Sequence, residues 1–513
     1  MPARALSAAE LPDDVADLKR LLRAQAEHYE AELARLSEQL NLLLAKRYGP
    51  SSEKISPDQL HLFNEAEAEG EPLDEEQPPA PIPVAAHTRP RRGRRPLPEA
   101  LPRVRIEHDL APEEKTCACG CALTPIGEEV SEQLDIVPAQ VRVLQHVRFK
   151  YACRACEETI KTAPLAPQPI PKSNASPGLL AHLAVAKYAD ALPLARQGRI
   201  LTRSGVDLPR ATLAAWMIKL GRLLAPVIAQ LRAHLLAYDI VQMDETRIQV
   251  LKEDGRDPSR HSFMWVQRGG PPHQPVLLFH YDPSRGRGVA LELLVGFRGF
   301  LQSDDFEVYA AIAAGEPDSI RLIGCFAHAR RKFDEALKAQ GKPTKTGKAH
   351  MGLAFIQRLN RVETQLRDRD PETRARERLA APILEELHAW LQRSLPEVPP
   401  STLTGKALAY LHTQWPRLIG YLADGRLAID NNACERAIRP FVIGRRNWLF
   451  ADTPNGAHAS AALYSVIETA KANGHEPYRY LRFLFTELPK AQSPEAIAAL
   501  LPFNIAPEDL PQP

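Results

Sequence analysis

The sequence lacks the long apolar runs that mark membrane proteins. No stretch approaches the ~18 to 20 consecutive apolar residues of a membrane-spanning helix, and the first residues lack the apolar core of a signal peptide. Net charge is also nearly absent, because 65 Lys and Arg residues face 63 Asp and Glu residues and leave a formal charge of +2. We therefore expect a cytoplasmic protein with no membrane partner, and its overall charge neither favours nor excludes a nucleic-acid partner.

Cysteine is scarce and unevenly placed. Five of the 7 cysteines fall between Cys117 and Cys156, in CACGC and YACRAC, which is a poor disulfide framework and a good metal site. A CxxC pair lets two thiolates reach one ion, and a second Cys group about 30 residues earlier completes a tetrahedral zinc site. We predict a zinc-binding domain at residues 101–170 whose structural Zn²⁺ is held by Cys117, Cys119, Cys153 and Cys156. Cys121 in place of Cys117 or Cys119 stays open as an alternative.

The N-terminal segment has a heptad pattern. A chain of 513 residues is expected to form roughly two to four domains, and residues 13–48 precede them as one predicted helix. Its apolar positions are Val15, Leu22, Tyr29, Leu36 and Leu43, with Ala26, Leu33 and Leu40 in the alternate seam. This spacing predicts a short coiled coil and hence a homo-oligomer. An amphipathic helix packed on its own domain is the alternative.

Residues 49–100 have the composition of a disordered linker, acidic first and basic at its end. The basic end carries Arg89, Arg91, Arg92, Arg94 and Arg95. An extended Arg-Gly-Arg segment can lie in a narrow minor groove or along phosphates. We regard these arginines as candidate DNA contacts, with a merely solvated linker as the alternative.

Two further segments have patterns compatible with DNA binding. Residues 141–151 alternate between apolar and basic side chains, which predicts a strand with one buried and one cationic face. Residues 175–235 are predicted to be helical, with a break at SGVDLP that suggests a helix-turn-helix. Arg210 and Thr212, at the start of its second helix, are the candidate DNA contacts. A solvated strand face and an ordinary helix pair are the respective alternatives.

From Tyr238 the pattern changes to strands. Three hairpin-spaced strands are followed by a fourth strand, a helix, a fifth strand and a helix, which is the order of a ribonuclease H-like fold. We predict an α+β multidomain protein with this catalytic core. The core is expected to form from two segments, 236–340 and 426–475, the second of which carries Glu435. A helical insertion at 341–425 would separate them, and a C-terminal helical tail would follow at 476–513.

Three acidic residues stand at matching points of this predicted core. Asp244 in VQMDET and Asp304 in GFLQSDDF lie on strands expected to be neighbours, and Glu435 in IDNNACERAIRP lies on a late helix. Three converging carboxylates repel one another, and two Mg²⁺ ions about 4 Å apart would relieve that repulsion. Such a site activates a water or a 3′-hydroxyl for displacement at phosphorus. It indicates a nuclease or a polynucleotidyl transferase.

Several residues next to the three acidic residues could also belong to the site. Successive strand residues face opposite ways, so we prefer Asp304 to Asp305, and we expect Glu245 to face solvent. Arg436 and Arg439 follow Glu435 on its helix, where they could bind a phosphate, or Arg439 could simply pair with Glu435. In CFAHARRKF we favour a packed Cys325 and a hydrogen-bonded His328 over a metal pair.

Taken together, these residues resemble the transposases of the insertion sequence 66 family. The matching stretches include RRGRRPLPEALPR, the Cys cluster, QMDET, LQSDDF, CFAHARRKF, DNNACERAIRP and PYRYLRFLFTELP. Two positions depart from the family pattern, since Asp305 stands where Gly is common and CACGC differs from the commoner CxxC.

The resemblance implies a transposase whose acidic triad falls on Asp244, Asp304 and Glu435. It implies Mg²⁺-dependent exposure of 3′-hydroxyls at terminal inverted repeats, and their joining to target DNA. Double-stranded DNA, both element ends and target, would be the partner, together with accessory proteins of the same element, in the nucleoid of a bacterium. An inactive transposase-derived DNA-binding protein and a structure-specific nuclease of the same fold are the alternatives.

Overall fold

The computed structural model describes residues 14–48, 141–152, 160–304, 306–340 and 347–511. The chain divides into two units, one made of Met1–Gly70 and Leu144–Pro513 and the other of Glu71–Val143. Of the second unit, only residues 141–143 are described, so the fold below is that of the first. The predicted linker, Asp305 and all five clustered cysteines lie outside the described residues.

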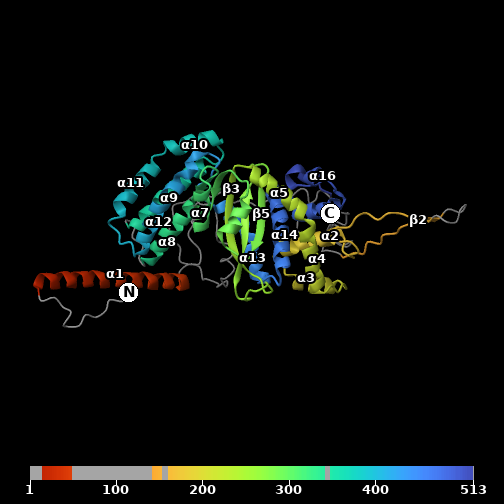
Figure 1. Cartoon of the computed structure of the whole chain (residues 1–513), viewed down its shortest axis with the longest axis horizontal. Helices are drawn as coiled ribbons and strands as arrows, with labels where there is room; N and C mark the ends of the chain where they lie inside the picture. The colour runs from red at the N-terminus through yellow and green to blue at the C-terminus, as the bar shows by residue number, and fades with distance from the viewer. Residues whose placement is uncertain (1–13, 49–140, 153–159, 305, 341–346, 512–513) are drawn as a thin grey trace, which may run out of the picture. The chain divides into compact units, whose positions relative to one another are not determined.

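A five-stranded mixed sheet, shown in green in Figure 1, forms the centre of the first unit. Its strands are β3 (Ile240–Gln249), β4 (His261–Gly269), β5 (Val276–Asp282), β6 (Gly299–Gln302) and β7 (Ile320–Ile323). The order is β5-β4-β3-β6-β7; β3, β4 and β5 pair antiparallel, whereas β6 pairs parallel with β3 and with β7. The predicted side-by-side placement of the first and fourth strands is confirmed.

The strands form where apolar, β-branched and aromatic residues run without a helical period. In β5, the segment VLLFHYD is buried at five of its seven positions, as expected for a strand covered on both faces. The order of strands and helices agrees with the prediction, except that helix α6 (Arg287–Leu293) lies unpredicted between β5 and β6.

Helices pack with the sheet to form the larger hydrophobic core. They are α2 (Pro177–Tyr188), α4 (Arg210–Leu223), α5 (Ala225–Ala237), α6, α7 (Glu307–Gly315), α13 (Asn432–Trp448), α14 (Pro454–Ala472) and α15 (Pro477–Glu487). Their starts are set by local chemistry: Ser176 and Thr453 each accept a hydrogen bond from a backbone N–H of the first turn, and a proline follows each cap. Short helices complete the C-terminus: η5 (Leu488–Lys490), α16 (Pro494–Ala498), η6 (Pro502–Asn504) and η7 (Pro507–Asp509).

A second hydrophobic core lies among the helices between β7 and α13. These are α8 (Phe326–Ala339), α9 (Lys348–Gln365), α10 (Pro371–Ala380), α11 (Ile383–Ser394), α12 (Leu403–Leu418) and η4 (Ile419–Ala423). Phe333, Ile356, Leu387 and Leu411 are among its fully buried residues. The described part of the stretch predicted as a helical insertion, residues 347–425, thus consists of helices joined by short connections.

Side chains of α14 cover part of one edge of the sheet, strand β5. Thr469 Oγ1 accepts a hydrogen bond from the backbone N–H of Leu277 at 3.0 Å, and Ser465 Oγ accepts one from Phe279 at 2.7 Å. Unpaired edge strands invite pairing with other chains. The two hydroxyls therefore satisfy part of the β5 edge inside the protein.

The predicted helix-turn-helix segment forms two helices. Helix α3 (Leu194–Arg203) and α4 are separated by residues 204–209, and Gly205 in this turn has a φ of 77°, which favours glycine. Arg210 is exposed at the first position of α4 and Thr212 is half-buried. This geometry supports the helix pair and does not test a contact with DNA.

The strand predicted at residues 141–151 is largely wrong. Only Lys150–Ala152 form a strand, β1, which pairs with β2 (Ile160–Thr162). The side chains expected to be buried are exposed, with Val143 at 93% and Phe149 at 67%. Alternation gives a strand only where a layer exists to bury its apolar face, and the described residues supply none to this segment.

The N-terminal helix α1 spans Val15–Tyr48. Its heptad residues are exposed, including Val15 at 62%, Leu22 at 61% and Leu36 at 51%. Residues outside that seam make hydrogen bonds to the helical region: Asn41 donates to the Ala339 carbonyl, and Glu38 accepts from the Leu403 N–H.

Among the described residues, no single helix is long and apolar enough to cross a membrane. Helices α4 and α5 together meet that criterion of length and composition, but they meet at a 48° bend.

Candidate active site

Two of the three candidate carboxylates are positioned by the parallel pairing of β3 with β6. The register pairs Ile240 with Phe300 and Gln242 with Gln302, so its continuation places Asp244 level with Asp304. Asp304 lies just beyond the end of β6 rather than within it, and its Oδ1 accepts a hydrogen bond from the Phe306 N–H at 3.1 Å. Both side chains are half-buried.

The third carboxylate, Glu435, lies in the first turn of α13. The start of this helix is tied to the strand that carries Asp244, because Asn431 Nδ2 donates to the Met243 carbonyl at 2.9 Å. The Asn431 N–H donates in turn to Cys325 Sγ at 3.1 Å. Asn431 is buried, so these contacts fix where α13 begins and hence where Glu435 lies.

The other residues of the DNN motif shape the turn before the helix. Asp430 accepts two hydrogen bonds from Asn432, one from its backbone N–H at 3.1 Å and one from Nδ2 at 2.6 Å. The Phe326 N–H donates to the Ile429 carbonyl just before the motif. The DNN motif therefore connects α13 to β3 and to the start of α8 through hydrogen bonds. We call this connection the joint before α13.

A chain of buried amides links the strands to the same joint. Gln242 and Gln302, neighbours on β3 and β6, are joined by a 2.8 Å hydrogen bond. Gln302 Nε2 also donates to the Ala428 carbonyl at 2.7 Å, and Arg268 donates to Gln242 at 2.9 Å. Satisfied buried networks of this kind make an arrangement rigid and specific.

The three carboxylates are close enough to influence one another's ionisation. Burial raises the pKa of Asp244 to about 8, and the negative charges of Glu245, Glu435 and Asp304 contribute to the rise. Burial also raises the pKa of Glu435, with Asp430 and Asp304 adding to the effect and Arg331 and Arg439 opposing it. The site concentrates acidic groups that resist being charged together.

Two residues that the sequence analysis did not assign to this site face Glu435 from α8. His328 Nε2 lies 3.8 Å from Glu435 Oε1, and an Arg331 nitrogen lies 3.6 Å from Oε2. Burial, followed by the charge of Arg331, lowers the pKa of His328 to about 4, so the imidazole is neutral at pH 7. Their spacing of three residues at the start of a helix places them on one face, and this was the signal available in CFAHARRKF.

The prediction for Cys325 and His328 is only partly right. Cys325 is buried and accepts a hydrogen bond, as expected. His328 is not satisfied in the way that was expected, because its buried Nδ1 has no hydrogen-bond partner among the described residues.

Glu245 does not face solvent, which corrects the prediction. Its side chain is only 1% exposed, and it accepts hydrogen bonds from Tyr309 Oη at 2.7 Å and Arg285 Nε at 2.7 Å. Tyr309 of α7 and Arg285 thus cover the face of β3 that carries Glu245. The assumption that the face opposite Asp244 is solvated was therefore wrong.

The remaining candidate DNA contacts lie in different places. Arg436 is exposed on α13, and Arg439 is half-buried near Glu435, where its charge opposes the rise in the pKa of that carboxyl. Arg89, Arg91, Arg92, Arg94 and Arg95 lie outside the described residues, as do Cys117, Cys119, Cys121, Cys153 and Cys156.

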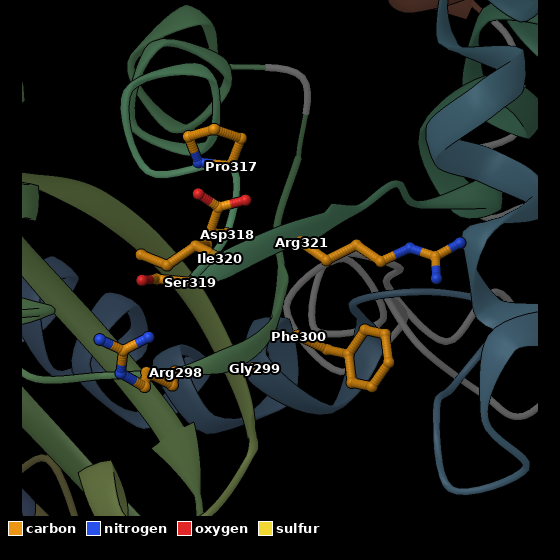
Figure 2. Close-up of a pocket in the computed structure, with 8 residues that line it drawn as sticks. All are labelled: Arg298, Gly299, Phe300, Pro317, Asp318, Ser319, Ile320 and Arg321. Carbon is orange, nitrogen blue, oxygen red and sulfur yellow. The ribbon is translucent and has the colours of Figure 1, made fainter.

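A hollow of about 370 Å³ lies away from the carboxylates, where β6 and β7 begin. Figure 2 shows its lining, in which Arg298 and Arg321 point to opposite sides and Asp318 is the one carboxylate. Asp304 follows the other end of β6. This hollow is therefore separate from the candidate active site.

The chemistry of the donor set fits a divalent cation such as Mg²⁺, since carboxylate oxygens are its preferred ligands. Burial raises the pKa of Asp244 most, the neighbouring carboxylates raise it further, and a cation would relieve that repulsion. Within the described ranges, however, no three His, Cys, Asp or Glu side chains are grouped closely enough to hold a metal ion as they stand.

Comparison with known proteins identifies the chain. The sheet and all three carboxylates lie within residues 172–459, which match a family of transposases. That family is described as transposase IS66 family, and because the match covers more than half of the chain, the chain belongs to it. The resemblance seen in the sequence is thus confirmed.

Three further segments match models from the same group of proteins. Residues 114–157, which include the five clustered cysteines, match a zinc-finger binding domain of transposase IS66. Residues 35–106 match transposase C of IS166 homeodomain, and residues 465–503 match the IS66 C-terminal element.

Similar proteins occur in Sinorhizobium fredii. Uncharacterized protein y4jD is 33% identical over 423 residues, covering 80% of this chain and 81% of the relative. Uncharacterized protein y4qI is 31% identical over 546 residues, covering 98% of this chain and 99% of the relative. These names assign no activity.

Proposed function

We propose that this protein is a Mg²⁺-dependent transposase that exposes 3′-hydroxyls at the terminal inverted repeats of its element and joins them to target DNA. Asp244, Asp304 and Glu435 would be its catalytic residues. The observation that carries the proposal is the β3–β6 register, which places Asp244 level with Asp304. The start of the helix that carries Glu435 is hydrogen-bonded beside Asp244.

We further propose that the sheet is a ribonuclease H-like core. The order β5-β4-β3-β6-β7 supports this assignment, as do three antiparallel strands followed by two parallel ones. The helices α8 to α12 then form an insertion between β7 and the helix that carries the third carboxylate. Membership of the transposase family supports the same reading.

Asp244, Asp304 and Glu435 would hold the divalent cations, two being the expected number. When bound, these ions activate a water or 3′-hydroxyl and stabilise the leaving oxygen at phosphorus. The three side chains must first approach one another, and their mutual repulsion opposes this approach in the absence of positive charge. Arg331 already offsets part of the charge on Glu435.

The outlying segments supply the proposed partners. Cys117, Cys119, Cys153 and Cys156, with Cys121 as an alternative ligand, would hold a structural Zn²⁺, which the zinc-finger match supports. The basic linker, the start of α4, and Arg436 and Arg439 would contact DNA. The exposed heptad seam of α1 supports a homo-oligomer, because an apolar seam is stabilised when a second copy covers it. Accessory proteins of the same element are further proposed partners.

The test is cleavage and joining of a labelled duplex that carries the element end, with Mg²⁺ and the full-length protein. Asp244→Asn, Asp304→Asn and Glu435→Gln should each lower the rate by ~10²-fold or more, because a lost metal ligand costs several kcal/mol of transition-state stabilisation. Asp368→Asn, which removes an exposed carboxylate of the helical region, is the matched control and should retain the wild-type rate.

The same assay separates the alternatives. Binding of the element end without any Mg²⁺-dependent cleavage would favour an inactive, transposase-derived DNA-binding protein. Cutting of branched DNA without joining would favour a structure-specific nuclease. Normal cleavage by all three acidic variants would refute the assignment of the catalytic residues.

A further inference from the structure

A second hollow, of about 360 Å³, lies beside the candidate active site and is lined mainly by arginine. We call it the arginine pocket. Its lining residues are Glu245, Thr246, Arg247, Phe263, Arg285 and Arg445.

The arginine pocket is built on the same two elements that carry the candidate catalytic carboxylates. On β3, residues 245–247 directly follow Asp244, and Thr246 is ~7 Å along the strand from it, on the same face. On α13, Glu435 lies in the first turn and Arg445 in the last. A strand of nucleic acid bound at the carboxylates would therefore have this pocket within reach of its neighbouring phosphates.

Two arginines of the pocket, Arg247 and Arg445, have no carboxylate partner among the described residues. Arg445 donates a hydrogen bond to Thr246 Oγ1 at 3.3 Å, and its charged neighbours are Arg446 and Arg247. Burial and these two positive charges lower the pKa of Arg445. Among the residues that the structure describes, Arg247, Arg445 and Arg446 form no ion pair with a carboxylate.

The one acidic residue of the lining is already engaged. Glu245 accepts hydrogen bonds from Arg285 and Tyr309, and the Arg285 guanidinium lies over the Phe306 ring with 3.7 Å between its Cζ and the ring centroid. Glu245 thus neutralises Arg285, and the part of the chain that the structure describes offers no counter-charge to Arg247 and Arg445. Guanidinium groups gathered in this way match the geometry of phosphate oxygens.

We propose that the arginine pocket binds a phosphodiester group of the DNA on which the protein acts, with Arg247 and Arg445 as its main contacts. That the bound phosphodiester belongs to DNA rests on the proposed function. The ligand could belong to the element end or to the target DNA, because both present the same phosphate chemistry.

The experiment measures DNA binding without chemistry. Full-length wild type and variants are titrated in EDTA, over a range of salt concentrations, into two fluorescently labelled duplexes, one from the terminal inverted repeat that flanks the gene and one unrelated. Arg247→Gln and Arg445→Gln should each weaken binding several-fold. Each should also reduce the slope of log K against log salt by about 0.9, the value for one lost phosphate contact on duplex DNA.

Two controls keep the result specific. Lys490→Gln removes the same charge from a lysine that is paired with Glu487 at 2.7 Å, and it should leave the slope unchanged. Arg445→Lys keeps the charge and should retain most of the slope. Arg247 is exposed, so its variant tests the pocket even if replacement of the half-buried Arg445 lowers the folding stability.

A smaller salt slope on both duplexes would support contacts to the phosphate backbone that end and target DNA share. A smaller slope on the end duplex alone would assign the pocket to the element end. Unchanged slopes for Arg247→Gln and Arg445→Gln on both duplexes would overturn the proposal. A different result would refute the proposed catalytic function: wild type that binds the end duplex but does not cleave it in Mg²⁺.

Discussion

Asp244 is the carboxylate of the candidate site whose pKa is raised to about 8. It lies on a central strand, where burial raises its pKa and the charges of Glu245, Glu435 and Asp304 raise it further. A carboxyl group in such a place is protonated at neutral pH in the absence of a cation. Its ionisation should therefore be visible in the stability of the metal-free protein.

Raising the pH from about 6.5 to about 8 in EDTA should destabilise the wild type relative to Asp244→Asn. The folded-state pKa of Asp244 is about 8 and its ordinary value is 3.8, so the folded protein keeps a proton that the unfolded chain releases. The stability that this proton contributes is complete below about pH 4 and is lost as the pH rises through about 8. One such proton changes the free energy of unfolding by ~1.4 kcal/mol per pH unit.

The measurement is made above pH 6.5 because His328 has the opposite effect on the free energy of unfolding at lower pH. Its folded-state pKa is lowered to about 4 from 6.5, so its contribution rises with pH between those values and opposes that of Asp244. Denaturant-induced unfolding at several pH values gives the measurement. Parallel curves for wild type and Asp244→Asn between pH 6.5 and 8 would contradict the raised pKa.

At this scale the sequence predicted that Asp244, Asp304 and Glu435 are neighbours, because strand order and helix position follow from local patterns. Their catalytic role stays a prediction. Glu245 was misplaced because alternation along a strand does not reveal whether its second face is covered. His328 and Arg331 were missed because their spacing shows that they share a helix face but not that Glu435, distant in the chain, lies opposite that face.

At the scale of elements, the joint before α13 decides where the third carboxylate lies. Arg378 is buried there and forms a bidentate ion pair with Glu363, at 2.6 and 2.7 Å. Arg378 also donates hydrogen bonds to the carbonyls of Tyr421, Asp424 and Leu427, which precede the DNN motif. The helical region thus holds the chain that leads into α13, the helix that carries Glu435.

Glu363→Gln should lower the free energy of unfolding by ~3 to 5 kcal/mol, because it leaves the charge of Arg378 buried without a partner. Arg358→Gln is the matched control, since it breaks an exposed ion pair with Glu386, and it should cost ~0 to 1 kcal/mol. Urea unfolding followed by circular dichroism measures both. Equal effects of the two substitutions would show that the Arg378 contacts do not support the joint.

Some helices and strands were predicted correctly and others were not, for physical reasons. The strands from β3 to β7 carry strong apolar runs, and their order was readable. Helix α6 was not predicted, because a seven-residue helix has too few turns for its period to be recognised. The strand expected at 141–151 failed because its alternation has no packing layer among the described residues.

At the scale of the whole molecule, the exposed apolar seam of α1 is the observation behind the proposed homo-oligomer. The hydrogen bonds of α1 to the helical region come from Asn41 and Glu38, outside the seam. The heptad residues remain exposed, with Leu22 at 61% and Leu36 at 51%. A second copy of the helix would bury them.

Leu22→Glu with Leu36→Glu should therefore shift the full-length protein toward the monomer, because charged residues in the seam oppose coiled-coil pairing. Arg20→Ala changes a residue that is exposed and outside the seam, and it should leave the mass unchanged. Sedimentation velocity gives the mass of each. A monomeric wild type, or an unchanged oligomer in the double variant, would assign another role to this helix.

The most direct test of the central claim, that Asp244, Asp304 and Glu435 share divalent cations, is Mg²⁺ binding to the full-length protein by titration calorimetry at several pH values. Affinity in the wild type should increase as the pH rises through about 8, with release of a proton from Asp244. It should be lost or strongly reduced in Asp244→Asn, Asp304→Asn and Glu435→Gln. Wild-type affinity in all three variants, with no dependence on pH, would contradict the account.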